Sequence, residues 1–428
     1  MSLALLHNPL ERRSRVFPPD EVTSLEGSAE VEPEAGGLAR ADVEAIWGSV
    51  VSLYETGIMP AIALCLRRRG QVVIDRAIGH ARGNEPRARK GALKVQAKPT
   101  TLFNLFSASK AVTAMLVHLL DERGDIHLDD AVADYIPEFG KHGKEWVTIR
   151  HVLTHRAGIP TVPGYKFDVD VLSRPDEILR LLCDTKPTTA PGRRLAYHAL
   201  TGGFLFAEIV KRVTGRDIQT FLTREVRKPL GFESFHYGIP EAKRGAMAEN
   251  ALTGPPTLPP ASWLLTRALG VSHEDAVALS NDPRFLSAVV PSGNIFATAN
   301  EVCRFYELLL RGGELDGKRI FDRRTVKRAV AEQTYLEMDL TIGLPIRYGM
   351  GFMLGGKTFS LYGPDTPHAF GHQGFTFVTT YADPDRDISA CLMTTGKPFL
   401  TWKAAYWWNV VRTIANHCPR DSRTRAKP

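Results

Sequence analysis

Runs of apolar residues with different spacing divide the chain into segments of different predicted structure. Helical spacing predicts a helix over 39–54, and two short β-type runs at 61–66 and 72–78, joined around Gly70, predict a hairpin. By contrast, residues 1–38 are rich in Pro, Glu and Gly and show no periodicity. We therefore expect an extended or poorly ordered lead-in before the first helix.

The pattern changes twice more along the chain. From about residue 121 to 285 it consists of helical segments divided by Pro- and Gly-containing loops. Strand-like runs then return at 349–354, 375–382 and 388–394, before an apolar helix at 402–415. This order predicts an α/β (α+β) fold, in which a sheet domain made from both chain ends carries an inserted all-α domain. The expected boundaries are 1–38 for the lead-in, 39–120 with 286–428 for the sheet domain, and 121–285 for the helical insertion.

Composition narrows the functional classes. The 428 residues are 43% hydrophobic and 24% charged, which is ordinary for a globular protein. The net charge of +7 comes from scattered Lys and Arg residues rather than a basic helix interleaved with aromatic residues, so we expect no nucleic-acid partner. We identify no membrane span or secretion signal, and the five cysteines form no C-x-x-C pair. These features predict a cytoplasmic protein without membrane contact, and they leave its oligomeric state open.

The first candidate site is a Ser-x-x-Lys pair, Ser107 and Lys110, beside the apolar segment 111–120. In a helix, this spacing places both side chains on one face, one turn apart. Serine needs an adjacent base to act as a nucleophile, and lysine serves only where burial or positive charge lowers its pKa. About one such pair is expected by chance in a chain of this length, so alone it favours a helix cap beside a solvated lysine.

Two other segments carry candidate residues. Tyr197 follows a Pro-Gly turn ahead of a predicted helix, where it can relay protons once nearby positive charge lowers the pKa of its phenol. His372 and Gln373 lie between Gly371 and Gly374 at the start of an edge-like strand, where substrate can approach the backbone closely. Strand N–H groups there can complete an oxyanion hole with the N–H of Ser107.

Other chemistries are not favoured. Two histidine pairs have a spacing of four, His151 with His155 and His368 with His372, but neither has a third ligand or carboxylate motif beside it. We expect neither a metal nor an organic cofactor. There is also no G-x-S-x-G, which excludes the nucleophile elbow of α/β-hydrolases.

Taken together, these motifs resemble the serine β-lactamase and penicillin-binding-protein superfamily, above all its class C β-lactamase branch and the related family VIII carboxylesterases. The resemblance covers residues from about 40 to 410, and it implies a β-lactamase-like antiparallel sheet flanked by helices. Three motifs in the family's order are far more specific than any one. Besides Ser107 and Lys110, the matching residues are 152–159 (VLTHRAGI, similar to the family's LLTHTSGL), Pro191-Gly192 before Tyr197, Pro291-Ser292-Gly293, and Ala297-Thr298-Ala299 before Glu301.

The resemblance implies roles for the candidate residues. Ser107 would attack an ester carbonyl while a neutral Lys110 accepts its proton. Tyr197 would pass a proton to the leaving alkoxide, and His372 would hydrogen-bond the Tyr197 oxygen or the alkoxy side of the substrate. The N–H groups of Ser107 and Phe375 would hold the oxyanion, because Phe375 stands just after the family's K-T-G position.

Two departures from the family pattern bear on the substrate. The usual Y-x-N ends here in Ala199, and K-T-G is replaced by His372-Gln373-Gly374. Ala199 makes no side-chain hydrogen bond, and histidine is at most partly charged near neutral pH, so binding of an anionic peptide or β-lactam is weakened. We therefore expect a serine carboxylesterase that forms an acyl-enzyme with a small-molecule ester, with Gln373, Gly374 and Ala199 as pocket candidates.

Three alternatives remain open from the sequence. The first is a β-lactamase or D-amino-acid peptidase on the same fold, with β-lactam cleavage as a weak side activity of an esterase. The second is acyl transfer to an alcohol or amine instead of water. The third is a non-catalytic binding protein on an old hydrolase scaffold, against which the joint retention of Ser107, Lys110 and Tyr197 argues.

Overall fold

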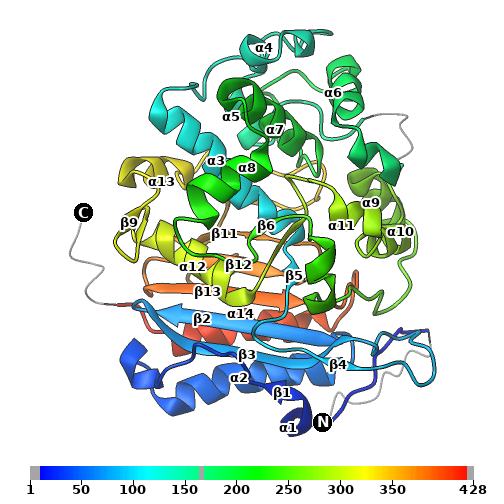
Figure 1. The fold of residues 1–428 in the computed structure, drawn as a ribbon, viewed down its shortest axis with the longest axis vertical. Helices are drawn as coiled ribbons and strands as arrows, with labels where there is room; N and C mark the ends of the chain where they lie inside the picture. The colour runs from blue at the N-terminus through cyan, green and yellow to red at the C-terminus, as the bar shows by residue number, and fades with distance from the viewer. Residues whose placement is uncertain (1–9, 163–167, 422–428) are drawn as a thin grey trace.

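An antiparallel sheet built from both ends of the chain forms the centre of the molecule (Figure 1). The structure is a computed structural model that describes residues 10–162 and 168–421. In this part of the chain the main sheet has eight strands, in the order β1-β3-β2-β13-β12-β11-β10, with β4 paired to β3. Their bounds are Thr23–Ser24 (β1), Ala61–Arg68 (β2), Gln71–Arg82 (β3), Val95–Gln96 (β4), Met353–Leu354 (β10), Phe370–Gln373 (β11), Thr379–Asp383 (β12) and Ile388–Thr394 (β13).

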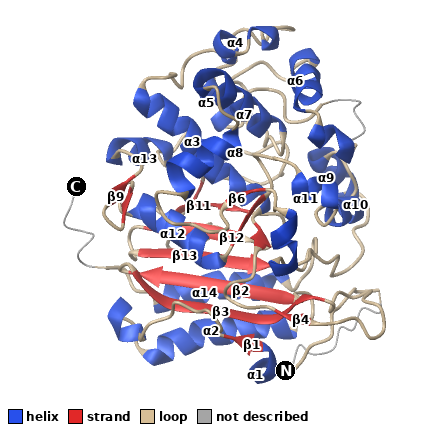
Figure 2. Cartoon of the chain, viewed as in Figure 1, coloured by secondary structure: helices blue, strands red, loops and turns tan. Residues whose placement is uncertain are grey.

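Both faces of this sheet are covered by helices, as Figure 2 shows. The helix α12 (Ala299–Leu310) packs against one face, and α2 (Arg40–Glu55) and α14 (Ala404–His417) pack on each other over the other. Because successive side chains of a strand point to opposite faces, a strand covered on both sides is apolar at almost every position. Alternate residues of β2 accordingly belong to two separate cores: Ala61, Ala63 and Cys65 to one, and Ile62, Leu64 and Leu66 to the other.

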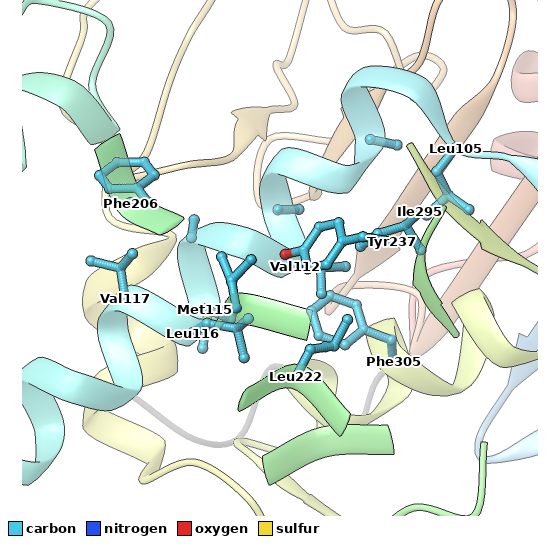
Figure 3. Close-up of a cluster of buried hydrophobic side chains, with 14 of the residues drawn as sticks. Leu105, Val112, Met115, Leu116, Val117, Phe206, Leu222, Tyr237, Ile295 and Phe305 are labelled. Carbon is cyan, nitrogen blue, oxygen red and sulfur yellow. The ribbon is translucent and has the colours of Figure 1, made fainter. Parts of the chain in front are cut away.

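One buried helix connects the sheet with the helical part of the molecule. α3 (Ser109–Arg123) is buried at every position from Ser109 to Leu120, as expected of a helix that is apolar on nearly all sides. Figure 3 shows its side chains Val112 and Met115 among residues from several other elements. Such a helix cannot shift without opening the core around it, so it is a rigid support for the residues at its beginning.

Most of the remaining elements are short, apart from the 14-residue helix α7. The helices are α1 (Pro19–Val22), α4 (Val132–Tyr135), α5 (Ile149–Leu153), α6 (Pro175–Asp184), α7 (Thr201–Thr214), α8 (Ile218–Leu222), α9 (Ala261–Leu269), α10 (His273–Leu279), α11 (Pro283–Ser287) and α13 (Arg323–Ala329). Two small sheets add β5 (Phe103–Asn104), β7 (Ile295–Ala297) and β6 (His236–Tyr237), and β8 (Glu314–Leu315) with β9 (Lys318–Arg319). In the described ranges, none of the helices has both the length and the apolar character that a membrane crossing requires.

The strongly periodic elements were predicted correctly, and the weakly periodic ones less well. The helix at 39–54, the hairpin of β2 and β3, and the strand β13 are confirmed. The strand predicted at 375–382 begins only at Thr379, and that at 349–354 shrinks to Met353–Leu354. All five cysteines are buried and none is in a disulfide.

The expectation of a poorly ordered lead-in is wrong for residues 10–38; residues 1–9 lie outside the described part. Here β1 pairs with β3, and the Glu30 carboxylate accepts hydrogen bonds from the Arg76 guanidinium, at 2.6 Å for Nη2, and from the backbone N–H of Asp75. The segment is thus held to β3 by individual polar contacts and one short strand. They leave no apolar periodicity in the sequence, which is why the segment had no recognisable pattern.

Candidate active site

Ser107 lies on a short 3-10 turn, Phe106–Ala108, immediately before α3. The sequence pattern placed it at the start of the helix itself, but the N-cap of α3 is Ala108, so Ser107 has no capping role. Phe106 adopts a left-handed φ of 48°, which is strained for a bulky residue. The Asn104 side chain holds this turn by accepting a hydrogen bond from the Phe106 N–H at 2.8 Å. Backbone strain of this kind concentrates at functional sites.

The amine of Lys110 meets the Ser107 hydroxyl, with Nζ 3.2 Å from Oγ. Nζ also lies 2.7 Å from the carbonyl oxygen of Ala199 and 3.0 Å from that of Ser292, and it donates to both. Burial holds the pKa of Lys110 well below its usual value. A neutral amine has two N–H groups and one lone pair. In the charged form the amine donates to Ser107 Oγ as well as to the two carbonyls. In the neutral form, with both N–H groups bound to the carbonyls, the lone pair would be left for the Ser107 hydroxyl.

Tyr197 completes a triangle with these two residues. Its side chain hydrogen-bonds that of Ser107, and its ring centroid is 4.8 Å from Lys110 Nζ. The expectation that positive charge lowers the pKa of this phenol is wrong. Burial raises the pKa of Tyr197, and the nearby Asp339 carboxylate adds to the rise. Lys110 does not offset this rise, because burial favours its neutral form. Tyr197 is thus a protonated phenol at neutral pH, suited to donate a proton.

His372 lies beside this triangle without a hydrogen bond to Tyr197. The two ring centroids are 6.2 Å apart, and His372 Nδ1 donates to its neighbour's carbonyl, Gln373 O, at 2.7 Å. Its Nε2 finds no hydrogen-bond partner among the described residues. Burial, assisted by Lys110, lowers the pKa of His372 to about 3, so the imidazole is neutral. The strand β11 that carries it is also not at the edge, since it lies between β10 and β12.

The two glycines around His372 and Gln373 accommodate the protein's own backbone rather than substrate. A Cβ on Gly371 would lie 2.0 Å from the Thr380 carbonyl oxygen, and one on Gly374 would lie 2.4 Å from that of Leu105. These close approaches bring the end of β11 against the chain that leads to Ser107. The Gln373 amide is turned to Thr379, whose hydroxyl donates to its Oε1 at 2.8 Å.

Ala199 and Phe375, by contrast, line a cavity that opens on Ser107. This serine cavity has a volume of about 120 Å³. Its wall is almost entirely apolar and includes Phe106, Ala199, Leu279, Phe285 and Phe375. The ring centroids of Phe106 and Phe375 are 5.6 Å apart, which places the Phe375 segment beside the nucleophile.

Three further residues shape the site. The Asp339 carboxylate accepts the backbone N–H of Tyr197 at 3.0 Å and the Tyr348 hydroxyl at 3.1 Å, and no sequence pattern pointed to it. Ser292 contributes only its carbonyl, although the Pro291-Ser292-Gly293 match could have drawn attention to it. His155 packs on Tyr197 with ring centroids 4.7 Å apart, from within the segment 152–159.

Comparison with known proteins shows the family of the chain. The family model described as Beta-lactamase matches residues 46–410. The chain belongs to this family. It is 28% identical over 306 residues to the "Esterase/beta-lactamase LipL" of Mycobacterium tuberculosis, with 68% of each chain covered.

Solved structures in the same superfamily share the fold. The structure superimposes on that of a penicillin-binding-protein homologue from Caulobacter crescentus with a TM-score of 0.73 at 28% identity, covering 89% of this chain and 99% of the other. A family VIII carboxylesterase gives a TM-score of 0.74 at 24% identity, covering 88% and 98%. The Beta-lactamase family member described here is therefore a hydrolase of the serine β-lactamase superfamily.

Proposed function

We propose that the protein is a serine carboxylesterase that works through an acyl-enzyme on Ser107. The observation that carries this proposal is the bonding of Lys110. Its Nζ contacts the carbonyl oxygens of Ala199 and Ser292 and lies 3.2 Å from the Ser107 oxygen, so a neutral amine that donates to both carbonyls keeps its lone pair for Ser107. The proton of the hydroxyl passes to Lys110 as Oγ forms a bond to the ester carbonyl carbon.

The other groups serve the collapse of the tetrahedral intermediate. Tyr197 gives its phenolic proton to the departing alkoxide as the carbon–oxygen bond breaks, and the Lys110 ammonium restores that proton. A water molecule then attacks the acyl-enzyme, its proton moves to the same pair, and Ser107 leaves with a proton returned by Lys110. The backbone N–H groups of Ser107 and Phe375 hold the oxyanion, while the neutral His372 faces the alkoxy side with its free Nε2.

Esters fit this site better than anionic peptides or β-lactams. His372, in the position of the family's lysine, is neutral, and the residue in the position of the family's asparagine is Ala199. No charged side chain lines the serine cavity in the described residues. We expect β-lactam cleavage to be weak at most, and acyl transfer to an added alcohol to compete with hydrolysis only at high acceptor concentration. The substrate is a small-molecule ester, and the reaction needs no cofactor.

The first test is intact-mass spectrometry after treatment with a fluorophosphonate, together with hydrolysis of p-nitrophenyl butyrate. We expect one adduct on the wild type and neither adduct nor turnover for Ser107→Ala. The matched control is Ser109→Ala, because the Ser109 hydroxyl only accepts the Ile295 N–H at 3.0 Å, so this variant should keep the adduct. An adduct that persists in Ser107→Ala would show that the nucleophile is another residue.

Rival functions are separated on the same samples. Nitrocefin turnover faster than that of the butyrate ester would indicate a β-lactamase. Butyryl esters of an added alcohol as the main product would indicate an acyltransferase. Neither adduct nor turnover on the wild type would indicate a binding protein.

A further inference from the structure

A second apolar cavity lies next to the serine cavity. This distal cavity has a volume of about 110 Å³, and its wall includes Val162, Leu172, Ile178, Leu181, Leu182 and Phe204. Most of these side chains come from α6 and α7, in the helical part of the molecule. None of them lies close in sequence to Ser107, so the sequence alone gave no sign of this cavity.

The two cavities share one wall. Ala199, Leu200 and Leu269 line both of them, the first two just before α7 and the third at the end of α9. Leu200 and Leu269 are only partly buried, and Leu200 also packs against the core on both sides of the sheet. The family's usual asparagine at position 199 would place an amide in this wall, whereas Ala199 contributes only a small apolar methyl group.

Apart from the nucleophile and the half-buried Thr161 of the distal cavity, the side-chain hydroxyls of the two walls already have partners. Three hydroxyls near the walls are bound to backbone carbonyls: Ser280 to Val277 at 2.7 Å, Ser292 to Leu200 at 3.2 Å and Thr201 to Ile159 at 2.8 Å. No charged side chain lines either cavity in the described part of the chain. A polar or charged group placed here would lose its hydration without compensation, so the occupant must be apolar.

The position of Tyr197 decides which half of an ester enters. Tyr197 is the proton donor to the leaving alkoxide, so the alcohol half must lie on its side of Ser107. Neither Tyr197 nor His372 lines the serine cavity. The acyl half therefore points into the serine cavity, and its far end reaches the shared wall.

We propose that the enzyme acts on esters of medium- to long-chain fatty acids, whose acyl chain runs from Ser107 through the serine cavity, past Leu200 and Leu269, into the distal cavity. This inference rests on the proposed esterase function and names its substrate class. Each methylene buried in such a channel raises kcat/KM about fourfold. Straight chains are favoured over branched ones, since the acyl chain must pass the side chains of two leucines, Leu200 and Leu269, which line both cavities.

The test is the chain-length profile of the full-length protein with p-nitrophenyl acetate, butyrate, octanoate, decanoate and laurate below their micelle concentrations. We expect kcat/KM for decanoate to exceed that for butyrate by at least about tenfold. Octylboronic acid and butylboronic acid bond reversibly to the serine hydroxyl and are not turned over. As inhibitors of butyrate ester hydrolysis, we expect octylboronic acid to bind more tightly than butylboronic acid.

A matched pair of variants tests where the far end of the substrate's acyl chain lies. Leu181→Trp fills the distal cavity, and we expect it to lower the decanoate-to-butyrate ratio of kcat/KM by about tenfold or more. Leu179→Trp makes the same change two residues earlier on α6, where the side chain faces a different hollow, and it should leave that ratio within about twofold of wild type.

Failure of the acyl channel can be distinguished from failure of the proposed function. If the wild type hydrolyses acetate and butyrate through Ser107 but kcat/KM falls steadily beyond four carbons, with butylboronic acid the tighter inhibitor, the esterase stands and the acyl channel is refuted. If Leu179→Trp and Leu181→Trp change the ratio equally, the distal cavity is not the end of the chain and the channel is likewise refuted. If no ester is turned over and Ser107 takes no adduct, the proposed function fails and the channel with it.

Discussion

Two buried lysines lie on either side of the nucleophile turn, and they differ in what their amines touch. Lys110 Nζ contacts two carbonyls and the Ser107 hydroxyl. Lys397 follows β13; its Nζ donates to the Thr394 carbonyl at 2.8 Å and lies 4.6 Å from the ring centroid of Phe106. Burial lowers the pKa of both, to about 7 for Lys397.

The comparison shows that a lowered pKa does not by itself make a lysine a catalytic base. Burial favours the neutral form of both amines, yet only the Lys110 amine lies beside a serine hydroxyl. Lys397 faces an aromatic ring, which attracts the ammonium form but offers no proton to remove. We therefore assign Lys110 to catalysis and Lys397 to the support of the turn that carries Phe106.

The largest expected effect comes from removing each amine in turn. Lys110→Met should lower kcat/KM for p-nitrophenyl butyrate by about 1000-fold or more, because Ser107 loses its base. Lys397→Met removes an amine of the same size and burial, and it should stay within about tenfold of wild type. Near-UV circular dichroism checks that both variants are folded. Equal losses in the two would mean that the assignment of roles is wrong.

The pH profile of the wild type sharpens the same contrast. Because the pKa of Lys110 is lowered, its neutral form persists below the usual range, and kcat/KM should fall only as the pH falls through that lowered pKa. The pKa of Lys397 shifts in the same direction, so the acid limb must be assigned with Lys397→Met, in which it should remain. A profile that is flat from pH 5 to 9 would argue against Lys110 as the base.

A smaller effect, which depends on the substrate, is expected for Tyr197, whose ring lies beside the amine of Lys110. Tyr197→Phe removes the proton donor, so cleavage of ethyl butyrate, whose alkoxide is strongly basic, should fall by about 100-fold or more. p-Nitrophenyl butyrate should lose less, because p-nitrophenolate departs without a proton. Parallel assays of the two esters measure the difference; equal losses would show that Tyr197 does not protonate the leaving group.

The smallest effect concerns stability. The pKa of Lys397 is about 7 in the folded protein and near its usual value of 10.5 when unfolded, so the unfolded chain binds more protons between these pH values. Stability of the wild type therefore gains a contribution as pH rises through this window, up to about 1.4 kcal/mol per pH unit. Lys397→Met lacks that gain.

Urea unfolding of both proteins at pH 7, 8 and 9 tests this expectation. The free energy of unfolding of Lys397→Met relative to wild type should fall by about 1 kcal/mol for each pH unit. Other groups that titrate in this range do so in both proteins and cancel in the difference. Parallel curves would show that Lys397 is charged in the folded state.

The sequence by itself determined the features that depend on local spacing. Ser107 and Lys110, three positions apart ahead of an apolar segment, suggested a nucleophile beside its base. Only the other motifs of the family, taken with this pair, favoured that interpretation over a helix cap. The near-continuous apolar runs of β2 and β13 predicted strands because a doubly covered sheet requires them. The motifs around Tyr197 and His372, in the family's order, predicted which distant segments meet.

Only the tertiary structure decided the state of these groups and the shape of the space around them. The protonation of Tyr197 and the neutrality of His372 follow from burial among residues hundreds of positions apart, which no local pattern records. Asp339 holds Tyr197 through a backbone N–H, an interaction any carboxylate on a nearby loop could make. The two apolar cavities are likewise assembled from separate helices. Long-range packing sets desolvation and volume, and these decide what the site can bind.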